Sequence, residues 1–357
     1  MNKESGIVLL IVVVIVAILS TLVVDFMYFI QVDTEISANT RDDIKAKYIA
    51  KSGVNVVAGT IKDKSLEELK GEIGLLTNQG VEIDEDWAIN VPFFPVGDGN
   101  VSLHIVDERS KINLNALISP SANLIDNQVY VELNELFKFL GVDAKKSGEF
   151  IGSLINWLDR PVQGKKNDQD SSGANTEHYQ SLEKPIKIKD GPLDSLDEIR
   201  MIQGMDVEFF EKIKDYVTVY PVDKKVNFST ASRAVMFAAL KGAIVPTLQK
   251  QEGAKPEDLK DSVAERIVDD IIEARKENAV IDRQKVTEIV NNVDPTLRMN
   301  AGLSGVVFHS GQSDVFRVTS IGSIGEDNPT IRAVEAVLRN NRSSSHKGVE
   351  IITWKET

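Results

Sequence analysis

The fold of this chain is decided near its N-terminus by the stretch Gly6-Ile7-Val8-Leu9-Leu10-Ile11-Val12-Val13-Val14-Ile15-Val16-Ala17-Ile18-Leu19-Ser20-Thr21-Leu22-Val23-Val24, which carries no charge from Ile7 onward. Eighteen residues of α-helix, at about 1.5 Å per residue, reach roughly 27 Å, which is enough to cross the hydrocarbon core of a bilayer. The stretch therefore predicts a membrane-spanning helix. The rest of the chain is expected to form the part that this helix anchors.

Four kinds of segment share such a composition. A cleaved secretory signal has a basic leader and a small-residue cleavage site behind its apolar core, whereas this leader balances Lys3 against Glu4 and the core is followed by Asp25. A buried core helix would show a polar face, which this run lacks. A plain signal anchor fits the run. A prepilin-type segment fits it best, because the prepilin peptidase cleaves after a Gly directly ahead of the apolar run, here between Gly6 and Ile7.

Composition sets the outer limits on the remaining residues. At 357 residues the chain has room for two or three domains, and 42% hydrophobic with 27% charged residues is typical of globular proteins. The formal net charge of -13 disfavours binding to nucleic-acid phosphate. The absence of cysteine excludes disulfides, thiolate metal sites and a cysteine nucleophile. Lys3 before the apolar run and Asp25, Asp33 and Glu35 after it favour a cytoplasmic N-terminus.

Helical periodicity continues beyond the apolar run without a proline. Apolar residues recur at roughly helical spacing between charged ones up to about Ile61, and the small residues of 46–55 would allow close packing on a sheet. These features predict one helix of about 50 residues, roughly 75 Å long. The alternative is two helices with a break near Asp25.

Strand patterns occur at both ends of the remaining chain. Residues 101–107 alternate as a strand does, residues 314–323 and 330–339 could pair across a turn, and residues 348–354 form a final strand. Residues 62–98 are less regular, with a short helix near 66–75 and turns marked by Pro92 and Pro95. The block between the strands is helical and loop-rich. The simplest arrangement is an α+β domain with an α-helical domain inserted into its sheet.

Several motifs then resemble those of one family, the K-type minor pseudopilins of the type II (general) secretion system, over nearly the whole length. The motifs occur in the family's order: Gly6 before the apolar run, Asp107-Glu108-Arg109-Ser110-Lys111-Ile112-Asn113-Leu114-Asn115, Ile155-Asn156-Trp157-Leu158-Asp159, Gly191-Pro192-Leu193-Asp194-Ser195-Leu196-Asp197-Glu198-Ile199-Arg200, Lys225-Val226-Asn227-Phe228-Ser229-Thr230-Ala231-Ser232 and Ile351-Ile352-Thr353-Trp354-Lys355-Glu356.

The resemblance implies a fold class and a domain plan. The fold is α+β and type IV pilin-like, with a long N-terminal helix packed on an antiparallel sheet and an inserted α-helical domain. The expected parts are a leader peptide (1–6), the transmembrane half of the helix (7–24), the first part of the pilin domain (25–115), the inserted domain (116–310) and the C-terminal pilin strands (311–357).

The resemblance also implies a noncatalytic function. It predicts a minor pseudopilin at the tip of the pseudopilus, with the N-terminus cytoplasmic and the folded part periplasmic on the inner membrane. Expected partners are the I-type and J-type minor pseudopilins, the major pseudopilin, the inner-membrane assembly platform, membrane lipid and the prepilin peptidase. That peptidase would leave Ile7 as an N-methylated first residue.

Ile11 connects the resemblance to the membrane. Most pilin-like proteins carry Glu as the fifth residue of the mature chain, where it pairs with the amine of a neighbouring subunit; after cleavage behind Gly6 the fifth residue here is Ile11. An unpaired carboxylate in hydrocarbon is costly, so a subunit with no neighbour above it does better without one. Ile11 is therefore the predicted filament-tip determinant, although a plain anchor would also have an apolar residue there.

Calcium is the one cofactor that the resemblance implies, in the polar segment after the Trp157 helix. The candidate ligands are Asp159, Asp168, Asp170 and Glu177, with Asn175 as a further oxygen donor. Such oxygens suit calcium. The family's dense acidic run is replaced here by 160–166, which includes two lysines, so a solvated acidic loop remains an equal alternative.

Two other functional classes find less support in the sequence. Residues 202–205 with their flanking helices resemble a helix-hairpin-helix, which binds nucleic acid or protein, but the neighbouring residues are Asp206, Glu208 and Glu211, whereas phosphate binding favours basic neighbours. A membrane-anchored periplasmic enzyme is the second alternative, and the four histidines show no metal-binding or triad spacing. The sequence therefore predicts a protein that is not an enzyme and does not bind nucleic acid.

Overall fold

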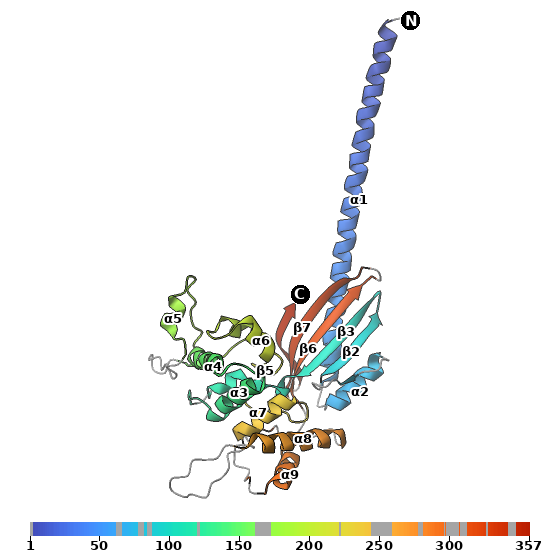
Figure 1. Cartoon of the computed structure of the whole chain (residues 1–357). Helices are drawn as coiled ribbons and strands as arrows, with labels where there is room; N and C mark the ends of the chain where they lie inside the picture. Colours follow the sequence, from blue (N-terminus) through green and yellow to red (C-terminus); the bar gives the residue numbers. More distant parts are fainter. Residues whose placement is uncertain are drawn as a thin grey trace.

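The computed structural model describes residues 3–61, 66–77, 82–83, 88–119, 122–160, 173–220, 223–243, 259–277, 281–295, 297, 307, 313–325, 328–341 and 348–357. A single helix, α1 (Lys3–Thr60), projects far beyond the folded part (Figure 1). It is 58 residues long and continuous, so the alternative of a break near Asp25 is wrong. The predicted long N-terminal helix is confirmed.

The second half of α1 packs on an antiparallel sheet. The sheet has the order β1-β2-β3-β6-β7-β8, formed by β1 (Glu82–Ile83), β2 (Ile89–Val96), β3 (Gly99–Asp107), β6 (Val315–Ile324), β7 (Thr330–Asn341) and β8 (Gly348–Glu356). A short helix, α2 (Leu66–Thr77), follows α1. On the helix side of the sheet, Val101, Leu103 and Ile105 alternate with the more exposed residues of β3, which gives the amphipathic pattern of a sheet covered on one face.

Strand β2 differs from the sequence-based expectation. Pro92 and Pro95 predict turns, yet both lie inside β2. Proline cannot donate a ladder hydrogen bond, and the β2–β3 pairing accommodates this with a register shift between Val91 and Phe94. The strand next to β2 on its other side, β1, is only two residues long, so most of β2 has no described partner there and tolerates the missing donors.

A helical region interrupts the sheet between β3 and β6. These two strands pair along their whole length, from Gly99 with Ile324 to Asp107 with Phe316, although about 200 residues of chain separate them. The intervening elements are η1 (Glu108–Ser110), β4 (Ile112–Asn113), η2 (Leu114–Leu117), α3 (Asn127–Phe139), α4 (Ala144–Leu158), α5 (Thr176–Gln180), η3 (Leu196–Met201), α6 (Val207–Ile213), β5 (Val217–Thr218), α7 (Arg233–Ala243), α8 (Asp261–Glu277) and α9 (Arg283–Val293).

The helical region has its own hydrophobic core. Phe137, Phe150 and Phe209 pack edge-on or tilted, with ring centroids 5.1–6.0 Å apart, and Trp157 packs against Tyr179. This core is separate from the one between α1 and the sheet. The predicted α+β fold with an additional helical region is therefore confirmed. The exact limits 116–310 stay a prediction, because residues 308–312 lie outside the described part.

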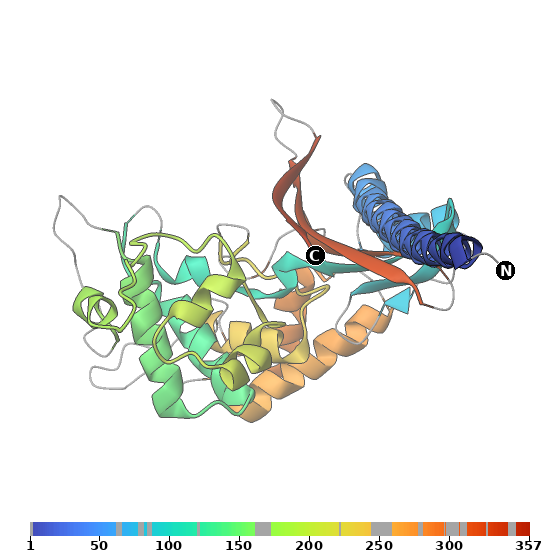
Figure 2. The same ribbon diagram turned by 90° about the horizontal axis from the view of Figure 1, so that it is seen from above.

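The helical region lies to one side of α1. Seen from above, with α1 nearly end-on, the sheet separates α1 from most of the helices (Figure 2). We call the helical region between β3 and β6 the head. It is displaced sideways from the axis of α1, and its orientation depends on the short connections at β3 and β6.

Candidate functional site

The apolar N-terminal half of α1 is not covered by any other described part of the chain. Large apolar side chains from Ile7 to Val24 are all between 48% and 66% exposed. By length and composition this is the one helix among the described residues that could cross a membrane, and its apolar window is not buried within the fold. Its two hydroxyls are satisfied internally: Ser20 Oγ donates to the Val16 carbonyl and Thr21 Oγ1 to the Ile18 carbonyl, both at 2.8 Å. Such internal hydrogen bonds suit a segment in hydrocarbon.

The three residues predicted for processing and tip position lie at the start of this helix. Gly6 is already within α1, and Ile7 and Ile11 are 61% and 51% exposed. The side chains of Ile7 and Ile11 can therefore contact lipid or another helix. The peptidase site and the tip role of Ile11 stay predictions.

A ridge of exposed residues continues along α1 past this apolar segment, on the side away from the sheet. Its apolar members in the folded part are Ile44, Tyr48 and Val56, which are 49%, 66% and 39% exposed. The opposite side of the helix, with Ala46 and Ala50, is fully buried on the sheet. We call Ile44, Tyr48 and Val56 the outer ridge. Exposed apolar residues in a row on a helix are a typical surface for packing a second helix.

Two of the four candidate calcium ligands, Asp159 and Glu177, lie within the described residues. Asp159 ends α4 and is buried, and one of its carboxylate oxygens, Oδ1, accepts a 2.6 Å hydrogen bond from the Asn123 amide. Asn175 Oδ1 caps α5 by accepting from the His178 backbone, while Glu177 is exposed. Asp168 and Asp170 lie outside the described residues. Among the described residues, no three acidic or histidine side chains could hold a metal together. The described donors alone do not fit a calcium ion.

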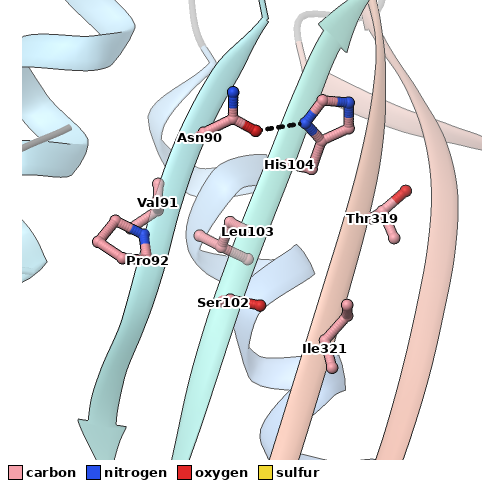
Figure 3. A pocket seen from close by; sticks show the side chains of 8 residues that line it. All are labelled: Asn90, Val91, Pro92, Ser102, Leu103, His104, Thr319 and Ile321. Atoms are coloured by element: carbon pink, nitrogen blue, oxygen red, sulfur yellow. Dashed lines mark hydrogen bonds between the residues drawn. The ribbon is translucent and has the colours of Figure 1, made fainter. Parts of the chain in front are cut away.

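A shallow hollow lies on the open face of the sheet, the face that α1 does not cover (Figure 3). Within it, His104 Nδ1 and Asn90 Oδ1 are 2.6 Å apart. An amide cannot activate an imidazole as a carboxylate would, so this pair has no evident proton-transfer role. The lining as a whole is Asn90, Val91, Pro92, Ser102, Leu103, His104, Thr319 and Ile321.

The helix-hairpin-helix alternative corresponds to a tight turn. Gly204 adopts a φ of 91°, and a Cβ there would come within 2.7 Å of the Phe150 backbone nitrogen. The Asp206 side chain then caps α6 by accepting from the Phe209 backbone, and it also pairs with Lys146. The glycine is thus required for packing against α4. The glycine turn at 202–205 therefore has a structural role in the packing of the helical region.

A buried polar cluster joins the sheet to the helical region, and no sequence pattern predicts it. Asp107, Glu108 and Arg109 are consecutive, buried and charged, and they connect the sheet to the helical region. The motif that contains them resembles the family's motif, but it does not predict which residues they contact. The one signal in the sequence is the position of these three residues, at the end of a predicted strand and directly before the helical block.

Comparisons with known proteins agree with this architecture. Residues 110–222 match the family model "Type II secretion system (T2SS), protein K". Type II secretion system protein K of Aeromonas hydrophila is 23% identical over 249 residues, covering 67% of this chain and 71% of the relative. The protein of the same name from Klebsiella pneumoniae is 25% identical over 247 residues, with the same shares covered. Residues 110–222 thus match the protein K family, and the chain as a whole is similar to the K-type minor pseudopilins.

A solved structure shows the same fold as this chain. A chain in the crystal structure of the GspK–GspI–GspJ complex from enterotoxigenic Escherichia coli matches with a TM-score of 0.53 at 18% identity, over 92% of this chain and 98% of that one. At this identity the likeness concerns the fold alone. The family is a structural component of type II secretion, in keeping with the long exposed helix described above.

Proposed function

We propose that this chain is a K-type minor pseudopilin and forms the tip subunit of a type II secretion pseudopilus, which it helps to initiate and then caps. The observation that carries the proposal is the combination of an uncovered helix with a head set to one side of it (Figure 2). The helix offers lipid and partner contacts along its length. The head is far larger than a pilin sheet alone, and its bulk would obstruct a further subunit stacked above.

The proposed partners are an I-type and a J-type minor pseudopilin, since the related solved complex contains GspI and GspJ. The proposed topology is single-pass in the inner membrane, with the N-terminus cytoplasmic and the head periplasmic. The major pseudopilin and the assembly platform would meet the same helix. Ile11 supports the tip position, because no subunit above is needed to neutralise a buried carboxylate.

Mass spectrometry of the full chain extracted from membranes tests the processing step. We expect a mature N-terminus at Ile7, carrying an N-methyl group, when the prepilin peptidase is present. The uncleaved chain should accumulate when Gly6 is replaced by valine, while Gly59→Ala, in the same helix but far from the cut, should be processed normally. An N-terminus other than Ile7 in the wild type would refute the pilin assignment of this segment.

The outer ridge is the proposed docking surface for a partner helix. Tyr48→Asp is expected to weaken co-purification with the I-type and J-type subunits at least tenfold, because a partner helix would have to bury a charge. The fold should be unaffected, since Tyr48 is 66% exposed. Leu75→Asp on α2 changes a side chain that is 84% exposed and serves as the matched control. Equal recovery of the complex with Tyr48→Asp and wild type would contradict this assignment.

Calcium binding in the polar segment stays a proposal that this function does not require. If the ion is bound by Asp159, Asp168, Asp170 and Glu177, saturating calcium should raise the unfolding temperature of the full chain by several degrees relative to chelator. Asp170→Asn should abolish that rise, whereas the exposed Asp215→Asn should not. An identical unfolding temperature with calcium and with chelator would favour the solvated acidic loop.

A further inference from the structure

Two neighbouring strands carry the whole helical region. The chain leaves the sheet at the end of β3, at Asp107, and re-enters it at the start of β6, at Val315, and Asp107 pairs with Phe316 across the two strands. Two adjacent connections would by themselves act as a hinge, because they leave one axis of rotation free. Something must therefore hold the head at one angle to the sheet and to α1.

Arg109 connects the two sides of this hinge. Its Nη1 and Nη2 donate to the Asp223 carboxylate at 2.8 and 3.1 Å, and Asp223 belongs to the helical region. Its Nε and Nη2 donate to the carboxylate of Asp314, the residue directly before β6, with the Nη2 contact at 3.0 Å. The side chain of Arg109 is only 5% exposed. A planar guanidinium that donates to a carboxylate along each of two edges restricts both the distance and the relative rotation of the two segments that it joins.

The carboxyl group of Asp107 is held by both parts of the molecule. Asp107 Oδ2 accepts from Asn227 Nδ2 at 2.9 Å and from Thr230 Oγ1 at 2.6 Å, both in the helical region. Asp107 Oδ1 accepts from Ser313 Oγ on the returning chain. Burial raises the pKa of Asp107, and these hydrogen bonds oppose that shift.

Glu108 makes the third connection. Its Oε2 accepts from Thr218 in β5 of the helical region, and its Oε1 accepts from Arg317 Nε in β6 at 2.8 Å. Arg317 in turn pairs with Glu335 on β7, also at 2.8 Å. Three consecutive residues thus each bind both the helical region and the chain that returns to the sheet.

We infer that Arg109 is a positioning residue, which sets the angle between the helical region and α1 and so directs the head over the filament end. The placement of the head over the filament end rests on the proposed tip function, whereas the angle between the helical region and α1 does not. Another ion pair joins the same two parts, between Lys355 on β8 and Asp197 in η3 at 3.3 Å, but these side chains are 62% and 60% exposed. Exposed pairs of this kind contribute little.

The ion pair between Arg109 and Asp223 stays charged at neutral pH. Although burial disfavours the ionised form of Asp223, its hydrogen bonds from Arg109 and the nearby positive charge lower the pKa of this carboxyl below its ordinary value. Arg109 therefore faces an ionised partner at neutral pH. Removing the guanidinium leaves two carboxylates facing each other across the hinge without a cation between them, which favours opening.

A distance measurement on the full chain in detergent tests this inference. The protein has no cysteine, so Asn55→Cys on α1 and Glu265→Cys on α8, both at exposed positions, give two unique spin-label sites. Pulsed electron paramagnetic resonance should give one narrow distance distribution for otherwise wild-type protein. Arg109→Met should broaden that distribution at least twofold or shift its maximum. Arg109→Lys keeps the positive charge but cannot hydrogen-bond both carboxylates in the same way, so the width of its distance distribution should lie between those of wild type and Arg109→Met.

Control variants separate positioning from folding. Arg233→Met removes a different Arg–Asp pair, with Asp269, inside the head, and should leave the distribution unchanged. If Arg109→Met does not fold, Asp314→Asn can replace it. This variant weakens only the pairing of Arg109 with the residue before β6, and it should broaden the distance distribution too. An unchanged width in folded Arg109→Met, as judged by Trp157 fluorescence and circular dichroism, would overturn the inference. Because no partner is present, this result is independent of whether the subunit caps a filament.

Discussion

Replacing Gly322 with alanine is expected to lower the free energy of unfolding of the sheet and α1 by about 3 kcal/mol, as overpacking against backbone does at its upper range. Gly322 lies in β6 where α1 crosses the sheet. A Cβ at this position would lie 2.2 Å from the Ala46 carbonyl oxygen and 2.6 Å from the Ala50 nitrogen. Both atoms belong to the helix backbone, so no side-chain rotation can relieve the clash.

The consequence is a forced separation of α1 from the sheet. The helix presents Ala46 and Ala50, both fully buried, which places its backbone close to β6. Moving it outward by even an ångström would loosen contacts along the core that α1 shares with the sheet, including those of Val54 and Val57. Gly322→Val should cost more than Gly322→Ala, because it adds two further carbon atoms at the same place.

Thermal unfolding of the full chain in detergent measures this effect. Trp354 in β8 packs against the core between α1 and the sheet, and Trp157 lies in the core of the head. Because the chain also contains Trp87, variants that keep only Trp354 or only Trp157, with the other two replaced by Phe, report the two parts separately. Gly322→Ala should lower the transition reported by Trp354 more than the one reported by Trp157. The control is Gly59→Ala in α1, where a Cβ meets nothing within 4 Å and stability should be unchanged or slightly raised. Equal midpoints for Gly322→Ala and Gly59→Ala would contradict the close packing.

The sequence predicts this packing only in part. The uncharged run and the small residues of 46–55 together predict a long helix whose second half packs on a sheet, which the structure confirms. That the first half crosses a membrane stays a prediction. These features are local, and local patterns carry that information. The counterpart on the sheet, Gly322, could not be identified, because a glycine in a strand gives no sign of which element approaches it.

The same limit explains the elements that sequence patterns missed. Strand β2 contains Pro92 and Pro95, and only its position near the edge of the sheet permits them. The chemistry of Arg109 is even less visible, since its partners Asp223 and Asp314 are separated from it by 114 and 205 residues. Pairings at such separations depend on the completed fold. The calcium hypothesis depends equally on residues brought together by folding, and among its proposed ligands only Asp159 and Glu177 are described.

Replacing Glu108 with glutamine is expected to change both the stability of the protein and its pH dependence. The carboxylate is fully buried between Thr218 and Arg317, with Lys111 Nζ at 3.7 Å. Although burial opposes ionisation, the charges of Lys111 and Arg317 lower the pKa of Glu108 from 4.5 to about 2. At neutral pH, Glu108→Gln leaves these cations without their buried partner and should cost about 3 kcal/mol.

The pH dependence follows from the direction of this shift. Because the pKa of Glu108 is lower in the folded state, its ionisation stabilises the fold fully above about pH 4.5, and this contribution is lost as the pH falls toward 2. A shift of this size corresponds to roughly 3 kcal/mol. Wild-type protein should therefore lose stability steeply between pH 5 and 2, and Glu108→Gln should lose about 3 kcal/mol less over the same interval.

Acid titration of chemical unfolding distinguishes this group from the other carboxylates. Glu273→Gln on α8 serves as the control, because Glu273 pairs with Lys276 on the surface and is 68% exposed. Its stability curve should run parallel to that of the wild type, slightly displaced. The curve of Glu108→Gln should start lower at pH 7 and converge with the wild type near pH 2, since the protonated glutamate and the glutamine amide then carry the same charge. Parallel curves for Glu108→Gln and wild type would show that Glu108 does not bind the head to the sheet as an ion, and the junction would then depend on Arg109 and Asp107.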